Sequence, residues 1–422
     1  MRTHDVLIVG GGPVGVMLAV ALADRGLDAV VWEARVDDPG HSRALGVHPP
    51  SIELFDRLGL ADDLLADAVR IRRGVARREG RGLGVVPFDR ASSRWPFVAA
   101  VPQDRTERVL RAGLDARRAD ALRRGVRFVG LEQRDDHVVV RGARGHVPDA
   151  GPSDGPGGTG DGGDEVVVAA RFVVGADGTR SDVRAALGVD SSARDLPDRY
   201  VMGDFADDTG NGADAVVHLE RPGVVESFPL PGGRRRFVVH VGRLATGPAA
   251  PIGPVASTGP VASTRPVAPT AAEVADLVSR RTGSAVDPAT STMTSAFGVR
   301  RRLASRTVVG RVVLIGDAAH EISPIGGQGM NLGWLDGAAL EDVLVAALSR
   351  MGGRRLDASS FERFEARRAR AAVRAARQAE WNTALGRPIG RVAAPARDVA
   401  LGLVLRAPSR HLLASVYAMR WA

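Results

Sequence analysis

Three glycines near the beginning of the chain have the spacing of a phosphate-binding turn. Gly10, Gly12 and Gly15 follow an apolar run at residues 5–9 and precede an Ala- and Leu-rich stretch that continues to residue 24. In a strand–turn–helix unit, the first glycine permits the tight turn, the second lets the backbone approach a pyrophosphate, and the third lets helix and strand pack closely. The pattern therefore predicts a dinucleotide site. Its predicted residues are Gly10, Gly12, Pro13, Val14 and Gly15.

Glu33 lies where the ribose of such a dinucleotide is expected. A second apolar run, at residues 28–32, ends at this acid, eighteen residues after Gly15. An acid at this distance accepts hydrogen bonds from the ribose hydroxyls in dinucleotide-binding folds. A purely structural strand–helix–strand unit is the alternative interpretation. We favour a dinucleotide site because strand, glycine turn, helix, second strand and acid occur in that order.

A second apolar run that ends in an acid lies near the middle of the chain. Residues 172–176 are followed by Asp177 and Gly178, a turn sequence, and Ser181 then has the position of a helix N-cap. Taken alone, this segment could be an ordinary turn between a buried strand and a short helix.

A third segment of this kind combines an acid with a glycine-rich loop. The apolar run at residues 311–316 leads to Asp317, and residues 324–331 then open a helix that we expect to reach about residue 351. Asp317 can accept hydrogen bonds from polyol hydroxyls, and glycines admit a flat ligand. The helix start at Met330 offers backbone amides and positive potential to negative charge. An ordinary strand-to-helix loop is the alternative.

Together these segments resemble the signatures of the FAD-dependent aromatic hydroxylases, single-component flavoprotein monooxygenases typified by para-hydroxybenzoate hydroxylase. The three segments GGGPVG with Glu33, GADGTRSDVR and GDAAHEISPIGGQGMN occur in the family's order. Two lesser segments, SRALGVH and VPQDRTE, also match. The resemblance covers about residues 1–350.

The resemblance implies roles for individual residues. Arg43 and Gln103 would contact the chain of the flavin, and Asp317 would hold its ribityl part. Residues 329–331 would face its pyrimidine edge, and Asp177 with Gly178 would support both FAD and the approach of NAD(P)H. The predicted cofactor residues of these later segments are Arg43, Gln103, Asp177, Gly178, Asp317, Pro324, Gly327, Gly329, Met330 and Asn331.

Arg43 and His48 are the candidate catalytic residues. By the resemblance, Arg43 lies where flavin and substrate meet, and its alternative is a surface arginine paired with a nearby aspartate. His48 is the best-placed of the nine histidines because it follows Arg43 in a matching segment. A buried structural histidine is its alternative role. We expect no metal site.

The expected fold class is α/β, with a discontinuous Rossmann-like FAD-binding domain, an α+β substrate domain built on an antiparallel sheet, and C-terminal helices. The FAD-binding domain is assigned to residues 1–72, 98–188 and 300–352, the substrate domain to 73–97 and 189–299, a Pro-rich mobile insertion to 249–270, and a helical segment to 353–422. Many relatives that act on polyketides carry a thioredoxin-like C-terminal domain. The Arg- and Ala-rich segment here instead predicts a helical cap or a dimer contact, so a monomer or homodimer is expected.

Composition excludes several classes of function. The chain has no cysteine, which excludes disulfides and Cys-ligated metal sites, and no lysine, which excludes a Schiff-base lysine. Its net charge is +8, but arginines alternate with acids along most of the chain, so a nucleic-acid partner is not expected. No run reaches the length of an integral membrane segment, and no signal peptide is evident, so a cytoplasmic location is expected.

The function that follows from the resemblance is NAD(P)H-consuming hydroxylation of a phenolic or polyketide-derived aromatic by O₂, through a flavin C4a-hydroperoxide. A halogenase of the same fold would need a lysine and a Trp-x-Trp-x-x-Ile motif, both of which this chain lacks. An epoxidase, a Baeyer–Villiger monooxygenase and a flavin-dependent prenyl reductase stay open. A non-catalytic FAD-binding partner protein is the alternative from a different class.

Overall fold

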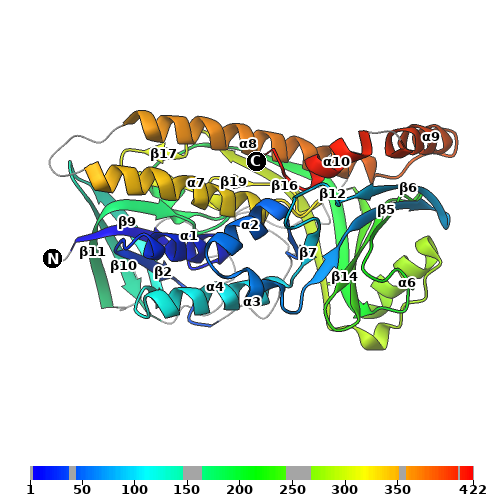
Figure 1. The fold of residues 1–422 in the computed structure, drawn as a ribbon, viewed down its shortest axis with the longest axis horizontal. Coiled ribbons are helices and arrows are strands. Elements are labelled where there is room, and N and C mark those ends of the chain that lie inside the picture. Colours follow the sequence, from blue (N-terminus) through cyan, green and yellow to red (C-terminus); the bar gives the residue numbers. More distant parts are fainter. Residues whose placement is uncertain are drawn as a thin grey trace, which may run out of the picture.

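The computed structural model describes residues 3–37, 44–145, 164–243, 268–350, 358–406 and 409–421 (Figure 1). Two large sheets lie toward opposite ends of an elongated molecule, and a long helix, α8 (Ala358–Leu385), runs along one side between them. Arg43, and most of the Pro-rich segment 249–270, lie outside the described residues.

The first sheet has at its centre four parallel strands: β2 (Ala29–Glu33), β1 (Thr3–Val9), β11 (Asp164–Gly175) and β18 (Val312–Leu314). In the register, Val9 lies opposite Gly175, which in turn lies opposite Leu314. The carboxyl ends of three strands therefore meet at one edge. Crevices at this edge of an open parallel sheet are where such folds bind ligands.

Further strands and helices belong to this half of the molecule. The strands are β8 (Leu122–Arg124), β9 (Val126–Gln133), β10 (Val138–Arg144) and β17 (Val308–Val309). The helices are α1 (Pro13–Asp24), α2 (Pro49–Arg57), α3 (Ala61–Leu65), α4 (Gln103–Arg117) and α5 (Asp182–Ala186). A small sheet of β3 (Gly46–Val47), β7 (Val98–Ala100) and β4 (Val69–Ile71) lies beside them.

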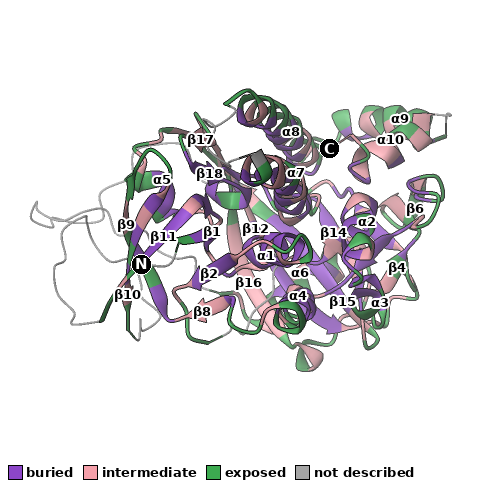
Figure 2. Ribbon diagram, turned by 60° about the vertical axis from the view of Figure 1, so that its left-hand side comes forward, coloured by how far each residue is buried: buried purple, intermediate pink, exposed green. Residues whose placement is uncertain are grey.

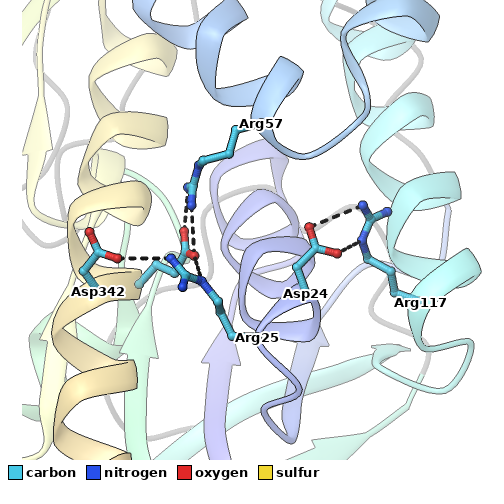
Figure 3. A network of polar contacts seen from close by, with 6 residues as sticks. Asp24, Arg25, Arg57, Arg117 and Asp342 are labelled. Carbon is cyan, nitrogen blue, oxygen red and sulfur yellow. Dashed lines mark hydrogen bonds and ion pairs between the residues drawn. The ribbon is translucent and has the colours of Figure 1, made fainter.

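Helix α1 is packed against other elements on all sides, and apolar residues accordingly occur around its whole circumference. All eight residues from Gly15 to Leu22 are buried, and the helix packs against α4 and against α7 (Gly329–Arg350). At its C-terminal end, Arg25 and Arg57 both donate to the buried Glu341 of α7, while Arg117 of α4 pairs with Asp24 (Figure 3). These ion pairs join α1, α2, α4 and α7.

The second sheet has the order β19–β16–β12–β15–β14–β13–β5–β6. Helix α6 (Ala271–Thr282) covers one face, where its Val274 and Val278 pack against Val225 and Val239. Figure 2 shows the buried residues concentrated in central strands such as β14 and β15. The strands are β5 (Arg73–Arg78), β6 (Arg81–Pro87), β12 (Ser191–Ala206), β13 (Ala215–His218), β14 (Val225–Leu230), β15 (Arg234–Arg243), β16 (Met293–Ala304) and β19 (His320–Glu321).

The α/β fold class is confirmed, with one departure in the second sheet. Strands β13, β14, β15, β12 and β16 are antiparallel as expected, but β13 pairs in parallel with β5. A parallel pair requires a long crossover connection, and β5 precedes β13 by more than a hundred residues of chain. After α8, the chain forms α9 (Ala393–Arg406) and α10 (Ser409–Tyr417). Within the described ranges, no helix is both long and apolar enough to cross a membrane.

A buried carboxylate in α7 connects the first sheet to two long helices. Asp336 accepts hydrogen bonds from the Gly316 N–H (3.0 Å), from His320 Nε2 (2.5 Å) and from Arg368 Nε of α8 (2.6 Å). Burial opposes its ionisation, but the charges of His320 and Arg368 lower the pKa of Asp336 to about 2. Burial likewise opposes charge on His320, whereas Asp336 raises the pKa of that histidine.

We predict that Asp336→Asn will lower the free energy of unfolding by about 3–5 kcal/mol, because it leaves two buried cations without their carboxylate. The folded-state pKa of Asp336 is lowered, so its contribution is present above the unfolded pKa of about 4 and is lost as pH falls toward 2. Urea titrations between pH 2 and pH 7 measure this. Asp342→Asn is the control, because it removes an exposed partner of Arg25 on the same helix and should cost about 0–1 kcal/mol. Equal losses in both variants would contradict the prediction.

Candidate FAD site

The glycine turn after β1 is shaped by close backbone contacts. Gly10 has a φ of +112°, and a Cβ on it would lie 2.3 Å from the carbonyl oxygen of Ala176. A Cβ on Gly15 would lie 2.0 Å from the Gly10 oxygen. At Gly12, the N-cap of α1, a Cβ would meet nothing within 4 Å, and no side chain caps the helix. Open space therefore lies in front of free backbone amides, which is where phosphates bind.

Pro13 and Val14 join this turn to the third segment. Trp334 Nε1 of α7 donates to the Pro13 carbonyl at 3.0 Å. A Cβ on Gly333 would come within 2.6 Å of the Val14 side chain, and one on Gly316 within 3.3 Å. The N-terminal turn of α1 and the segment that carries Asp317 are therefore packed together.

Glu33 lies at the end of β2 and contacts the same turn. Its Oε2 accepts from the Gly11 N–H at 2.8 Å, and its Oε1 accepts from the backbone N–H and the Nε of Arg35, both at 3.0 Å. A carboxylate offers about four acceptor sites, so one remains for a ribose hydroxyl. The residues that line the adjoining hollow are Gly11, Glu33, Arg35, Asp37, Arg111, Leu122 and Arg124.

Asp317, which follows β18, combines an accessible side chain with surroundings that disfavour its charge. Its side chain is accessible to water, yet surrounding protein raises its pKa to about 6. Both observations hold if the carboxylate faces a ligand-sized space inside the molecule. No hydrogen bond to Asp317 occurs within the described part of the chain, so its oxygens are available to a ligand.

The carboxylate of Asp177, unlike that of Asp317, accepts hydrogen bonds from groups of the protein. It accepts from Ser181 Oγ at 2.6 Å and from the Val183 N–H at 3.0 Å, at the start of α5. Gly178 has a φ of +82°, which the turn requires. In turn, Arg184 of α5 donates to the Ala318 carbonyl at 2.8 Å, next to Asp317. These contacts join α5 to the segment that carries Asp317, and they use the Asp177 carboxylate for hydrogen bonds within the protein.

The glycine-rich loop before α7 is held to β3 by Asn331. The Asn331 Nδ2 donates to the carbonyls of Gly46 (2.8 Å) and Gly327 (3.0 Å), and its Oδ1 accepts from the His48 N–H at 2.9 Å. The Asn331 side chain is buried and both of its N–H donors are used within the protein, so it holds the loop in place. Pro324 and Gly327 are exposed, and Gly329 and Met330 are partly accessible.

His48 is buried against this loop. Burial lowers its pKa to about 4, although hydrogen bonding to the backbone of Gly327 and Gly326 opposes that shift. His48 is therefore neutral at neutral pH, and its Nδ1 has no partner among the described residues. These contacts are those of a residue that positions the loop.

Gln103 lies at the first position of α4 and donates from Nε2 to Glu107 Oε1 at 2.8 Å. Glu107 also pairs with Arg111, one of the residues that line the hollow beside Glu33. Gln103 is thus connected to that side of the site through its own helix. Arg43 lies outside the described residues.

Gln328 is a candidate site residue that the sequence analysis missed. Its side chain is buried, and neither its Oε1 nor its Nε2 has a partner within the described residues. A buried amide without partners costs free energy unless a ligand or water satisfies it. Its place between Gly327 and Gly329 was the available signal. With Gly12 and Asp317, this unpartnered amide fits the polar groups and flat ring of FAD.

Comparison with known proteins identifies the family. The model of a family described as "FAD binding domain" matches residues 3–376. The chain belongs to this FAD-binding family. It is 32% identical over 348 residues to the 12-dehydrotetracycline 5-monooxygenase/anhydrotetracycline 6-monooxygenase of Streptomyces rimosus, covering 80% of this chain and 61% of that protein. It is 33% identical over 338 residues to a rifampicin monooxygenase of Streptomyces venezuelae, covering 79% and 62%.

A solved structure extends the likeness to the fold. An anhydrotetracycline hydroxylase from Streptomyces rimosus superposes with a TM-score of 0.74 at 27% identity, covering 99% of this chain and 76% of that one. This FAD-binding chain spans about three fifths of the length of the curated relatives it matches. The expected resemblance to flavoprotein aromatic hydroxylases is confirmed for family and fold.

We predict that Asp317→Ala will weaken FAD binding about 10- to 100-fold, because each hydrogen bond to a charged acceptor contributes about 1.5–3 kcal/mol. Fluorescence titration of the flavin-free protein with FAD measures the dissociation constant. Asp342→Asn, exposed on α7, is the matched control and should bind FAD like the wild type. An unchanged dissociation constant in Asp317→Ala would remove this carboxylate from the site.

Proposed function

We propose that the protein is an FAD-dependent monooxygenase that uses NADPH or NADH and O₂ to hydroxylate a phenolic or polyketide-derived aromatic. The observation that carries the proposal is the accessible carboxylate of Asp317, with its raised pKa, just beyond the carboxyl ends of β1, β11 and β18. The start of α1, with open space at Gly12, packs against the segment that carries Asp317, and Gln328 of the glycine-rich loop has an amide without a partner among the described residues. The names of the relatives, which are monooxygenases of tetracycline precursors and rifampicin, support the reaction class.

Residues of this chain would bind and orient the cofactor. The amides at the start of α1 would bind the pyrophosphate, Glu33 the adenosine ribose and Asp317 the ribityl hydroxyls. The N-terminus of α7, at Gly329 and Met330, would place positive potential beside negative charge on the reduced ring. When bound, FAD would supply hydride acceptance from NAD(P)H and activation of O₂. Dependence on NAD(P)H would place the reaction in the cytoplasm.

The second sheet would supply the substrate surface. Its face opposite α6 bears Tyr200, Met202 and Val238, which form one apolar cluster with Ile325 of the glycine-rich loop. Tyr200 and Phe297 stack with ring centroids 5.5 Å apart. Such a surface, facing the loop next to the flavin site, suits an apolar aromatic ring and excludes water from the reaction.

We predict that the FAD-loaded protein will oxidise NADPH or NADH faster when a suitable phenol or hydroxylated polycyclic compound is present. Under ¹⁸O₂, the product should gain one labelled oxygen atom, which mass spectrometry detects. Asp317→Ala, reconstituted at the same FAD concentration, is the comparison. Flavin that NAD(P)H never reduces would favour the binding role instead. Reduction that yields hydrogen peroxide with every compound of the panel would contradict hydroxylation.

A further inference from the structure

Glu226 is an acidic residue in the middle of an apolar strand, β14 (Val-Glu-Ser-Phe-Pro-Leu). Residues alternate between the two faces of a strand, and Val225 packs in the cluster under α6. The Glu226 side chain therefore belongs to the opposite face, the proposed substrate surface. In the register, Glu226 lies between Val217 and Val238, and Met202 lies opposite Val238. Glu226 thus lies in a row of apolar side chains across the sheet, formed by Val217, Val238 and Met202, which we call the apolar row.

The neighbours of Glu226 connect it to the loop beside the flavin site. Tyr417 of α10 is partly buried, desolvation raises its pKa to about 12, and the charge of Glu226 contributes to that shift. The hydroxyl of Tyr417 donates to Asn382 Oδ1 of α8 at 2.9 Å. Asn382 Nδ2 lies 2.9 Å from the position that a Cβ on Gly326 would occupy. Tyr417 thus lies close enough to feel the charge of Glu226, and its partner Asn382 approaches the glycine-rich loop.

Two ion-pair groups involve other charged residues on this face of the sheet. Arg236 and Asp204 form a bidentate ion pair with distances of 2.7 and 2.8 Å. Asp198 accepts from His240 at 3.1 Å and from Arg387 at 3.0 and 2.8 Å.

Glu226 itself has no hydrogen bond or ion pair within the described residues. Its side chain is partly accessible, while burial raises its pKa to about 7. Besides Tyr417, Tyr200 is a titratable group close to Glu226: burial, and then the charge of Glu226, raises the pKa of Tyr200. Glu226 is therefore a carboxylate without an ion-pair partner, among the described residues, on the proposed substrate surface.

We propose that Glu226 selects the substrate: its carboxylate accepts a hydrogen bond from a ring hydroxyl and disfavours aromatic acids, so the substrate is an uncharged hydroxylated aromatic. This inference rests on the proposed function. A hydroxyl donor satisfies a carboxylate that has few other partners, and hydrogen bonds to charged groups are the stronger ones. A second carboxylate in the same desolvated space would be repelled and would find no cation to pair with.

A pair of probes that differ in charge alone tests the proposal. The compounds are 3-(3-hydroxyphenyl)propionate and its amide, titrated into the FAD-loaded protein by calorimetry, without NAD(P)H, between pH 6 and 8.5. At pH 8, where Glu226 is ionised, the wild type should bind the amide at least ten-fold more tightly. This preference should shrink as the pH falls below about 7 and the carboxyl becomes protonated.

Glu226→Gln keeps the shape of the side chain and removes its charge, so the preference should be small and independent of pH. Glu220→Gln is the matched control, because Glu220 is a buried glutamate that accepts from the Glu79 N–H at 2.9 Å, outside the apolar row. It should behave like the wild type. FAD retention checks the folding of each variant.

Three results would overturn the proposal: equal affinities of the wild type for both probes at every pH, a preference that persists in Glu226→Gln, or failure of the wild type to bind either probe. If Glu226→Gln does not fold, the pH profile of the wild type alone decides. The labelled-oxygen experiment separately decides the proposed reaction. Failure of the selectivity can therefore be told apart from failure of the reaction.

Discussion

The arrangement of the candidate flavin-binding residues depends on the hydrogen bonds and ion pairs of one buried carboxylate, that of Asp336. It holds the backbone at Gly316, the side chain of His320 and the guanidinium of Arg368 on α8. Because Asp317 follows Gly316 directly, this contact sets where its carboxylate enters the crevice. Taking three charged groups out of water is costly, and their mutual hydrogen bonds offset that cost. The strand end, α7 and α8 therefore keep one arrangement.

A second set of contacts positions the glycine-rich loop between the two sheets. Asn331 binds the loop to β3, His48 lies buried against Gly326 and Gly327, and Asn382 of α8 approaches the loop from the other side. The loop thereby lies between the first sheet, with its free amides and accessible carboxylate, and the apolar face of the second sheet. A flat cofactor and an aromatic substrate would meet across this loop.

Polar residues of similar type have different surroundings in this site, and sequence patterns do not distinguish them. Asp177 and Asp317 both follow a buried strand, yet α5 occupies the carboxylate of Asp177 while that of Asp317 is accessible. Gln328 and Glu226 carried no motif-based role. Gln328 is a candidate because its buried amide has no hydrogen-bond partner among the described residues, and Glu226 because burial raises the pKa of a carboxylate that has no cation beside it in the described part of the chain. Both properties depend on residues distant in the sequence.

The sequence by itself determined the family, the α/β class and the glycine turn with its strand, helix and acid. These features are local, because the conformational freedom of glycine and the two-residue repeat of buried strands can be read over short stretches. Only the tertiary structure decided that β5 joins β13 in parallel, that Asp336 binds His320 and Arg368, and that Glu226 lies on the face of its sheet opposite α6. Each of these depends on contacts between segments far apart in the chain, where burial and the loss of water set the energies.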